Sequence, residues 1–163
     1  MVIKKKHFKT LFVTLILTGT LLGIIAANPV QAKYTGHFTT PTEVRGNWYQ
    51  YEGHHKWEHL KITRHAVSIN GKVLYTPRRN GVHQLYITKY KKGYGGVNYT
   101  FNHHIKYHYQ SLGSFWLSQR KIHGKRVLEN YYNMSWFSVY TRNKSTHDYS
   151  YQYKGNYLKK IGR

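Results

Sequence analysis

The chain has 163 residues and carries 26 Lys and Arg against 5 Asp and Glu, a net charge of +21 at pH 7. It has no cysteine, which excludes disulfide cross-links and thiol catalysis. It contains 17 Tyr, 4 Trp and 6 Phe, so we expect aromatic packing to supply much of the stability.

The first 32 residues have the composition of a secretory signal peptide. Four lysines within residues 4–9 precede an apolar run over 10–27, and Val30 and Ala32 are the small residues that signal peptidase requires. We expect cleavage after Ala32. The alternative is an uncleaved membrane anchor, because a run of about 18 apolar residues is just long enough to span a bilayer. No second apolar run follows, so we expect no stable membrane insertion after cleavage.

The remainder divides into a short polar segment, 33–40, and one expected β-domain, 41–163. From residue 33 onward the chain keeps 22 basic residues and all five acidic ones, a net charge of +17. An exported domain without cysteine is typical of Gram-positive bacteria. We therefore expect a secreted, extracellular protein that associates with the cell wall.

Apolar and polar residues alternate with a period of two through this domain, and no segment shows a sustained helical period. Clear examples lie at 97–101, 105–109 and 149–153, where aromatic residues occupy alternate positions. Merging neighbouring runs predicts nine strands, at 44–51, 57–69, 72–76, 82–90, 97–109, 115–121, 126–133, 136–142 and 149–158.

Two tight hairpins are predicted between these strands. Asn70-Gly71 is a strong two-residue turn signal and would set Val67 opposite Leu74. A second hairpin is expected to turn within 122–125. Short connections favour an antiparallel up-and-down meander closed into a barrel, which removes exposed edges. A two-sheet sandwich is the alternative.

The sequence Pro-Thr-Glu-Val-Arg-Gly-Asn-Trp-Tyr, residues 41–49, leads into the first predicted strand and contains Gly46 and Trp48. A short turn followed by Gly-x-Trp resembles the opening of the lipocalin, or calycin, family. The resemblance implies that Trp48 closes the base of a barrel under a basic residue from a late strand. Arg142 is the candidate, through cation–π stacking. Lipocalins usually have a C-terminal helix, whereas 149–158 is predicted here as a strand. The composition is similar to that of small secreted, lipocalin-like proteins of lactic acid bacteria.

The residue types of common catalytic and metal sites are sparse. Glu52 and Glu58 flank one turn, but we expect both on a solvated loop rather than as a catalytic pair. Histidines cluster at 54–59 and 103–108, but positions four apart on a strand are separated by about 13 Å. We therefore expect a protein that is not an enzyme and has no cofactor and no metal.

The positive charge indicates a polyanionic partner, because a cationic domain outside a cell is held electrostatically by an anionic envelope. Interleaved Tyr and Trp could stack on sugar rings. The alternative is that these charges only keep a tyrosine-rich fold soluble. The candidate contacts are the cations at predicted strand ends and loops: Arg78, Arg79, Lys89, Lys91, Lys92, Arg120, Lys121, Lys125, Arg126, Lys154, Lys159, Lys160 and Arg163.

We therefore expect a cationic, non-enzymatic binding protein of the cell envelope that associates with anionic or carbohydrate surface polymers. One alternative is a lipocalin-like carrier of a small apolar ligand inside the barrel. Another is a cationic antimicrobial factor. Nucleic acid is an unlikely partner, because an exported protein is separated from the nucleic acid inside the cell. The carrier requires an open interior, so the inward positions discriminate: Leu60, Ile62, Val67, Ile69, Tyr99 and Phe101.

Overall fold

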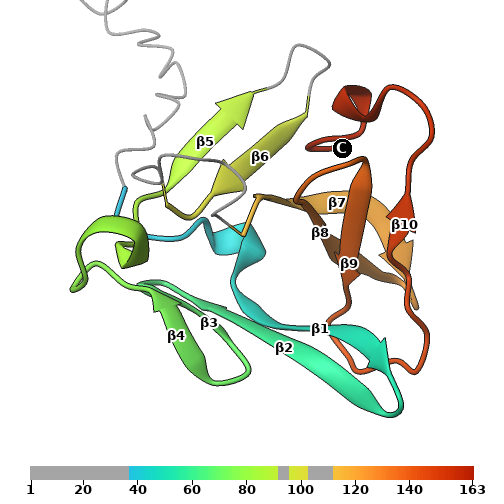
Figure 1. Ribbon diagram of the computed structural model, residues 1–163, viewed down its shortest axis with the longest axis horizontal. Coiled ribbons are helices and arrows are strands. Elements are labelled where there is room, and N and C mark those ends of the chain that lie inside the picture. The colour runs from blue at the N-terminus through green and yellow to red at the C-terminus, as the bar shows by residue number, and fades with distance from the viewer. Residues whose placement is uncertain (1–36, 92–95, 103–111) are drawn as a thin grey trace, which may run out of the picture. The chain divides into compact units, whose positions relative to one another are not determined.

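A computed structural model describes residues 37–91, 96–102 and 112–163. The predicted signal peptide, Lys92 and the histidine cluster at 103–108 lie outside these residues. No helix in the described ranges is long and apolar enough to cross a membrane. The elements there are strands and short 3-10 turns, which confirms the all-β prediction (Figure 1).

The strands form two antiparallel sheets. The first has the order β1-β2-β3-β4 and the second the order β10-β9-β8-β7-β6-β5. The first sheet contains β1 Gly46–Gly53, β2 Lys56–Thr63, β3 Ala66–Ile69 and β4 Lys72–Tyr75. The second contains β5 Thr88–Lys91, β6 Val97–Thr100, β7 Ser114–Ile122, β8 Lys125–Tyr131, β9 Trp136–Tyr140 and β10 Tyr151–Gln152. The 3-10 turns are η1 Thr42–Val44, η2 Gly81–His83 and η4 Tyr157–Lys159.

Both predicted hairpin turns are confirmed. Asn70-Gly71 joins β3 to β4 with φ values of 50° and 81°, the left-handed conformation that a two-residue turn of this kind requires. His123-Gly124 joins β7 to β8 in the same way, with φ values of 49° and 75°. The predicted register of the first hairpin is wrong. An irregularity next to Val67 places Tyr75, rather than Leu74, opposite it.

Three predicted strand boundaries are also wrong. The run 57–69 is divided into β2 and β3 by a turn at residues 64–65, which contains neither Gly nor Pro to mark it. The run 82–90 begins with η2 and becomes a strand only at β5. The run 149–158 contains only the two residues of β10 and then η4, because Lys154-Gly155-Asn156 breaks the extended chain.

The two sheets are joined by isolated bridges rather than by continuous ladders. Tyr49 and Thr141 exchange both backbone hydrogen bonds, at 2.8 and 2.9 Å, which connects β1 to the end of β9. Thr76 forms a parallel bridge with Gln84 beyond the end of β4. Within the described ranges the ladders do not close into a barrel. The architecture is two antiparallel sheets whose edges are connected by isolated β-bridges.

The inner faces of both sheets pack against each other in one apolar core. Trp48, Leu60, Ile62 and Val67 come from the four-stranded sheet. Tyr99, Phe101, Phe115, Leu128 and Tyr140 come from the six-stranded sheet or the residues that follow its strands. The six inward positions predicted from the sequence all belong to this core, five of them buried and Ile69 half-buried. Packed apolar side chains therefore occupy these described positions between the sheets.

Candidate functional site: a basic hollow on the six-stranded sheet

Part of the outer face of the six-stranded sheet is covered by the C-terminal segment, residues 149–163, in which β10 extends the sheet beside β9 and the residues after it pack on outward rings. Its tyrosines stack on outward aromatic residues of the sheet: Tyr151 on Phe137, with ring centroids 5.2 Å apart, and Tyr157 on Tyr131, at 5.1 Å. Trp116 contacts Phe137 edge-on. These rings and Ile161 form a second apolar cluster, so this part of the sheet is buried on both faces.

Two outward groups of β7 hold the end of the C-terminal segment in place. Trp116 Nε1 donates to the main-chain oxygen of Arg163 at 2.8 Å, and Ser118 Oγ lies 2.9 Å from the same oxygen. Val97 N donates to Gly162 O at 3.0 Å, which fixes the segment to β6. These contacts set the position of the basic residues that surround Ile161.

An open hollow of about 450 Å³ lies where this cover meets the end of β7. We call it the basic hollow. Four cations and one acid line it, together with two tyrosines and two other polar residues. Its lining residues are Ser118, Gln119, Arg120, Glu129, Tyr151, Tyr153, Lys159, Lys160 and Arg163. The volume lies within the range of small-molecule sites.

Glu129 is the buried acid of the basic hollow, with 4% of its surface exposed. It points outward from β8, and Tyr151 OH donates to its Oε2 at 3.1 Å. Burial raises the pKa of the Glu129 carboxyl, because desolvation disfavours its charge. Hydrogen bonds from Ser118 and Tyr151, and the positive charges of Arg120 and Lys160, lower the same pKa but do not outweigh burial.

The cations of the basic hollow are placed beside its tyrosine rings. The guanidinium carbon of Arg120 lies 5.7 Å from the centroid of the Tyr151 ring, and Lys160 Nζ lies 5.1 Å from that of Tyr153. Both distances permit cation–π attraction. Burial and the charge of Glu129 raise the pKa of the Tyr151 hydroxyl, so it remains a proton donor at neutral pH. Four like charges around one hollow favour an anionic ligand.

The residues of the Gly-x-Trp resemblance meet at the junction of the two sheets. The guanidinium carbon of Arg142 lies 3.6 Å from the centroid of the Trp48 ring, and its Nη1 donates to Arg45 O at 2.8 Å. Gly46 has a φ of 127°, and a Cβ there would lie 1.9 Å from Arg142 Nη1. Burial lowers the pKa of the guanidinium. The structure thus brings Gly46, Trp48 and Arg142 together as a packing unit.

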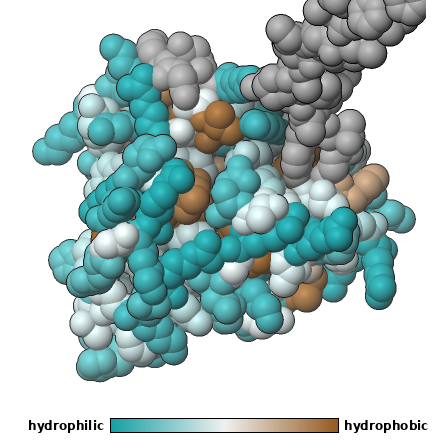
Figure 2. Space-filling model, turned by 180° about the vertical axis from the view of Figure 1, so that it is seen from behind, coloured by the Kyte–Doolittle hydropathy of each residue, from teal (hydrophilic) through white to brown (hydrophobic). Residues whose placement is uncertain are grey.

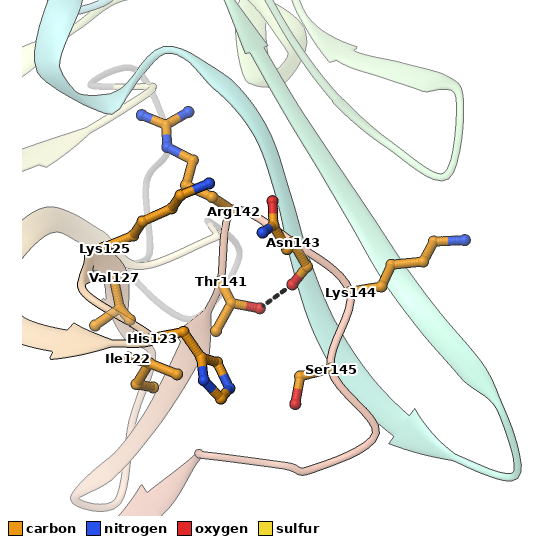
Figure 3. Close-up of a pocket in the computed structure, with 9 residues that line it drawn as sticks. All are labelled: Ile122, His123, Lys125, Val127, Thr141, Arg142, Asn143, Lys144 and Ser145. Carbon is orange, nitrogen blue, oxygen red and sulfur yellow. Dashed lines mark hydrogen bonds between the residues drawn. The ribbon is translucent and has the colours of Figure 1, made fainter.

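A crevice next to the β7–β8 hairpin has room for only about 30 Å³ (Figure 3). Lys125 and Arg142 line it, while Lys144 points away from it. Thr141 Oγ1 donates to Asn143 O at 2.6 Å, which stabilises the turn that follows β9. This volume is close to that of a single water molecule in the liquid, so the crevice is too small for a sugar.

The remaining predicted contacts are dispersed or engaged in the fold. Arg126 donates to the main-chain oxygens of Ser118 and Leu117, at 2.7 and 2.6 Å, and thereby supports the irregular part of β7. Arg79 donates to Val73 O at 2.9 Å. The other described candidates are exposed on strand ends and turns outside the basic hollow: Arg78, Lys89, Lys91, Lys121, Lys125 and Lys154.

A row of aromatic residues lies on the outer face of β1 and β2. Tyr49 stacks on His59 with centroids 4.9 Å apart, and Tyr51 lies 5.7 Å from Trp57. Lys144 Nζ lies 4.8 Å from the centroid of Trp57 and covers part of this row. The imidazole of His59 also contacts Asn47 at 3.0 Å. In the described part of the chain, no three His, Asp or Glu side chains are grouped to hold a metal ion.

The sequence did not single out Glu129, Ser118, Gln119, Tyr151 or Tyr153. One signal for Glu129 was present: it occupies an outward position on β8 whose neighbours two residues away are Val127 and Tyr131. An acid between two apolar residues on an outer face indicates that something covers that face. Comparisons with known proteins found no matching family model, no matching curated protein and no matching solved structure.

Proposed function

We propose that this is an exported, cationic, non-enzymatic protein that binds anionic or carbohydrate polymers of the cell envelope on its surface. The observation that carries the proposal is the basic hollow, where four cations, two tyrosine rings and one carboxyl surround a space of about 450 Å³. A cleft lined mainly by one sign of charge concentrates ligands of the opposite sign. Tyrosine rings beside cations supply apolar faces for sugar carbons.

The described core positions between the sheets favour surface binding over transport inside the fold, because they hold packed apolar side chains. The largest of these side chains, that of Trp48, is fully buried. A carrier of apolar ligands requires an open central cavity. On the face shown in Figure 2, hydrophilic residues predominate and apolar residues appear in separate small groups. That distribution gives no continuous apolar surface for a membrane on this face.

For the fold, we propose that the two sheets are the wall of one calycin-like barrel that is interrupted at its bridges. The Tyr49–Thr141 bridge joins β1 to the end of β9, and the packing of Arg142 over Trp48 lies at the same seam. The Thr76–Gln84 bridge, between the end of β4 and the residues before β5, lies at the other edge of the two sheets in strand order. These contacts support the resemblance that Gly46 and Trp48 suggest.

The test compares two polymers that differ only in charge. Residues 33–163 are titrated with dextran sulfate and with neutral dextran, from about 0.1 M to about 1 M salt. We expect binding to dextran sulfate alone, with an affinity that falls steeply as salt rises, because each neutralised anionic group releases a counterion. Equal binding to both polymers would leave carbohydrate recognition alone, and binding to neither polymer, or an affinity for dextran sulfate unchanged at the highest salt, would contradict the proposal.

Export has its own test. The protein recovered from the producing culture is analysed by mass spectrometry, and we expect a mature chain that begins at Lys33. If the chain is recovered only in the membrane fraction and with its N-terminus intact, it is an anchored protein and the proposed cleavage and release are wrong.

A further inference from the structure

The basic hollow contains an acid, and this limits which anions it suits. We propose that the hollow binds a phosphorylated sugar or polyol, with the basic side chains holding the phosphate and Glu129 accepting a ligand hydroxyl. This inference rests on the proposed function and names the ligand class of the same site. It assigns opposite roles to the two kinds of charge that line the hollow.

The geometry of Glu129 leaves it able to accept a further hydrogen bond. Its carboxylate has about four acceptor positions. Tyr151 OH occupies one of them, at 3.1 Å. Ser118 has only one hydroxyl proton, and the main-chain oxygen of Arg163 competes for it at 2.9 Å. A ligand hydroxyl that reached the carboxylate would therefore complete its hydrogen bonding.

The same carboxylate weakens the binding of a bare anion. Arg120 and Lys160 act on Glu129 electrostatically, so part of their positive charge is already neutralised inside the protein. An anion without hydroxyl groups would meet a repelling carboxylate and could not pair with it. A ligand with both groups satisfies the cations and the acid together, and unpaired buried acceptors are the strongest source of discrimination in such sites.

The tyrosines add a third element of recognition. Arg120 and Lys160 lie beside the rings of Tyr151 and Tyr153, which line the hollow. The carbon face of a sugar can lie against such rings while its phosphate contacts the cations. The volume of about 450 Å³ suits one or a few units of a polymer rather than a folded protein.

The experiment compares glucose 1-phosphate with methyl phosphate, which carries the same anionic group without sugar hydroxyls. Dissociation constants are measured by NMR on residues 33–163, following the indole N–H of Trp116, which lies beside the hollow. We expect wild-type protein to bind glucose 1-phosphate about tenfold more tightly, as one charge-assisted hydrogen bond would provide. In Glu129→Gln we expect methyl phosphate to bind more tightly and the preference to fall toward one.

Glu52→Gln is the control, because it makes the same chemical change at an exposed carboxyl of β1. We expect it to retain the preference. If wild-type protein binds neither phosphate, the basic hollow is not an anion site and the proposed function loses its support. If it binds both equally, or if Glu129→Gln keeps the full preference, only the role of Glu129 is overturned. The wild-type ratio is decisive even if Glu129→Gln does not fold.

Discussion

The outer faces of the two sheets differ in what covers them. Four consecutive residues of β8, 127–130, are buried: Leu128 belongs to the inner core, and Glu129 on the outer face is hydrogen-bonded to Tyr151 of the C-terminal segment. In β2 only Leu60 and Ile62 are buried, and the outward residues Lys61 and Thr63 next to them are exposed. The basic hollow lies where the cover ends, so it is built from two layers, whereas the outer face of β1 and β2 offers a single layer of side chains.

The largest expected effect tests whether the covered face contributes to stability. Phe137→Ala removes the ring between Trp116 and Tyr151 and should lower the free energy of unfolding by about 4 kcal/mol. Tyr51→Ala, on the outer face of β1, should cost only about 1 kcal/mol, because its ring is half-buried against Trp57. Urea unfolding of both variants measures the difference. Similar losses would show that the C-terminal segment is not a stable layer.

The next prediction concerns the junction of the two sheets. Gly46→Ala should cost about 3 kcal/mol, because it combines an unfavourable φ with a clash against Arg142. Gly53→Ala has a positive φ but nothing within 4 Å of its Cβ, so about 1 kcal/mol is expected. In an Arg142→Ala background the cost of Gly46→Ala should fall, which a double-mutant cycle measures. An unchanged cost would show that Arg142 is not what makes Gly46→Ala destabilising.

The smallest effect on stability follows from the raised pKa of Glu129. Stability from this group is greatest below the pKa of the unfolded carboxyl and decreases as the pH rises through the higher folded-state pKa. Glu129→Gln removes that decrease. We expect a gain on the order of 1 kcal/mol at neutral pH and little difference in acid. Thermal unfolding of both proteins across this pH range measures the difference in stability. A Glu129→Gln variant that is less stable than wild type at neutral pH would contradict the prediction.

The sequence was most informative where one face of a strand is buried. Alternation located β1 and most of β2, and the turn pairs at 70–71 and 123–124 located two hairpins. It failed where a second layer changes the pattern. Of the alternating tyrosines at 149–153, Tyr151 pairs with Phe137 in the short ladder of β10 on β9, and Tyr153 lies beyond that ladder against the outer apolar cluster. The turn at 64–65 carries no Gly or Pro, so nothing in the sequence separated β2 from β3.

The candidate site was predictable only in its charges. Arg120, Lys159 and Lys160 were expected to contact a polyanion because they are basic and lie near strand ends. Nothing local indicated that residues about 40 positions apart would line one hollow, because that depends on where the C-terminal segment lies on the sheet. Glu129 was missed for the same reason, since its burial comes from the cover.

If the basic hollow is the binding site, a local group of cations rather than the net charge determines the affinity for the polymer. The direct test compares two variants that each lose two Arg and two Lys. One changes the basic hollow: Arg120→Gln, Lys159→Gln, Lys160→Gln and Arg163→Gln. The other changes exposed residues on or next to the four-stranded sheet: Lys61→Gln, Arg64→Gln, Lys72→Gln and Arg78→Gln.

The measurement is the dissociation constant for dextran sulfate of wild-type protein and both variants at about 0.1 M salt, where surface charges act over roughly 10 Å. Both variants lose the same net charge, so a diffuse electrostatic attraction would weaken equally in the two. We predict that the hollow variant loses at least about tenfold more affinity than the matched variant. Equal losses would contradict a binding site in the basic hollow.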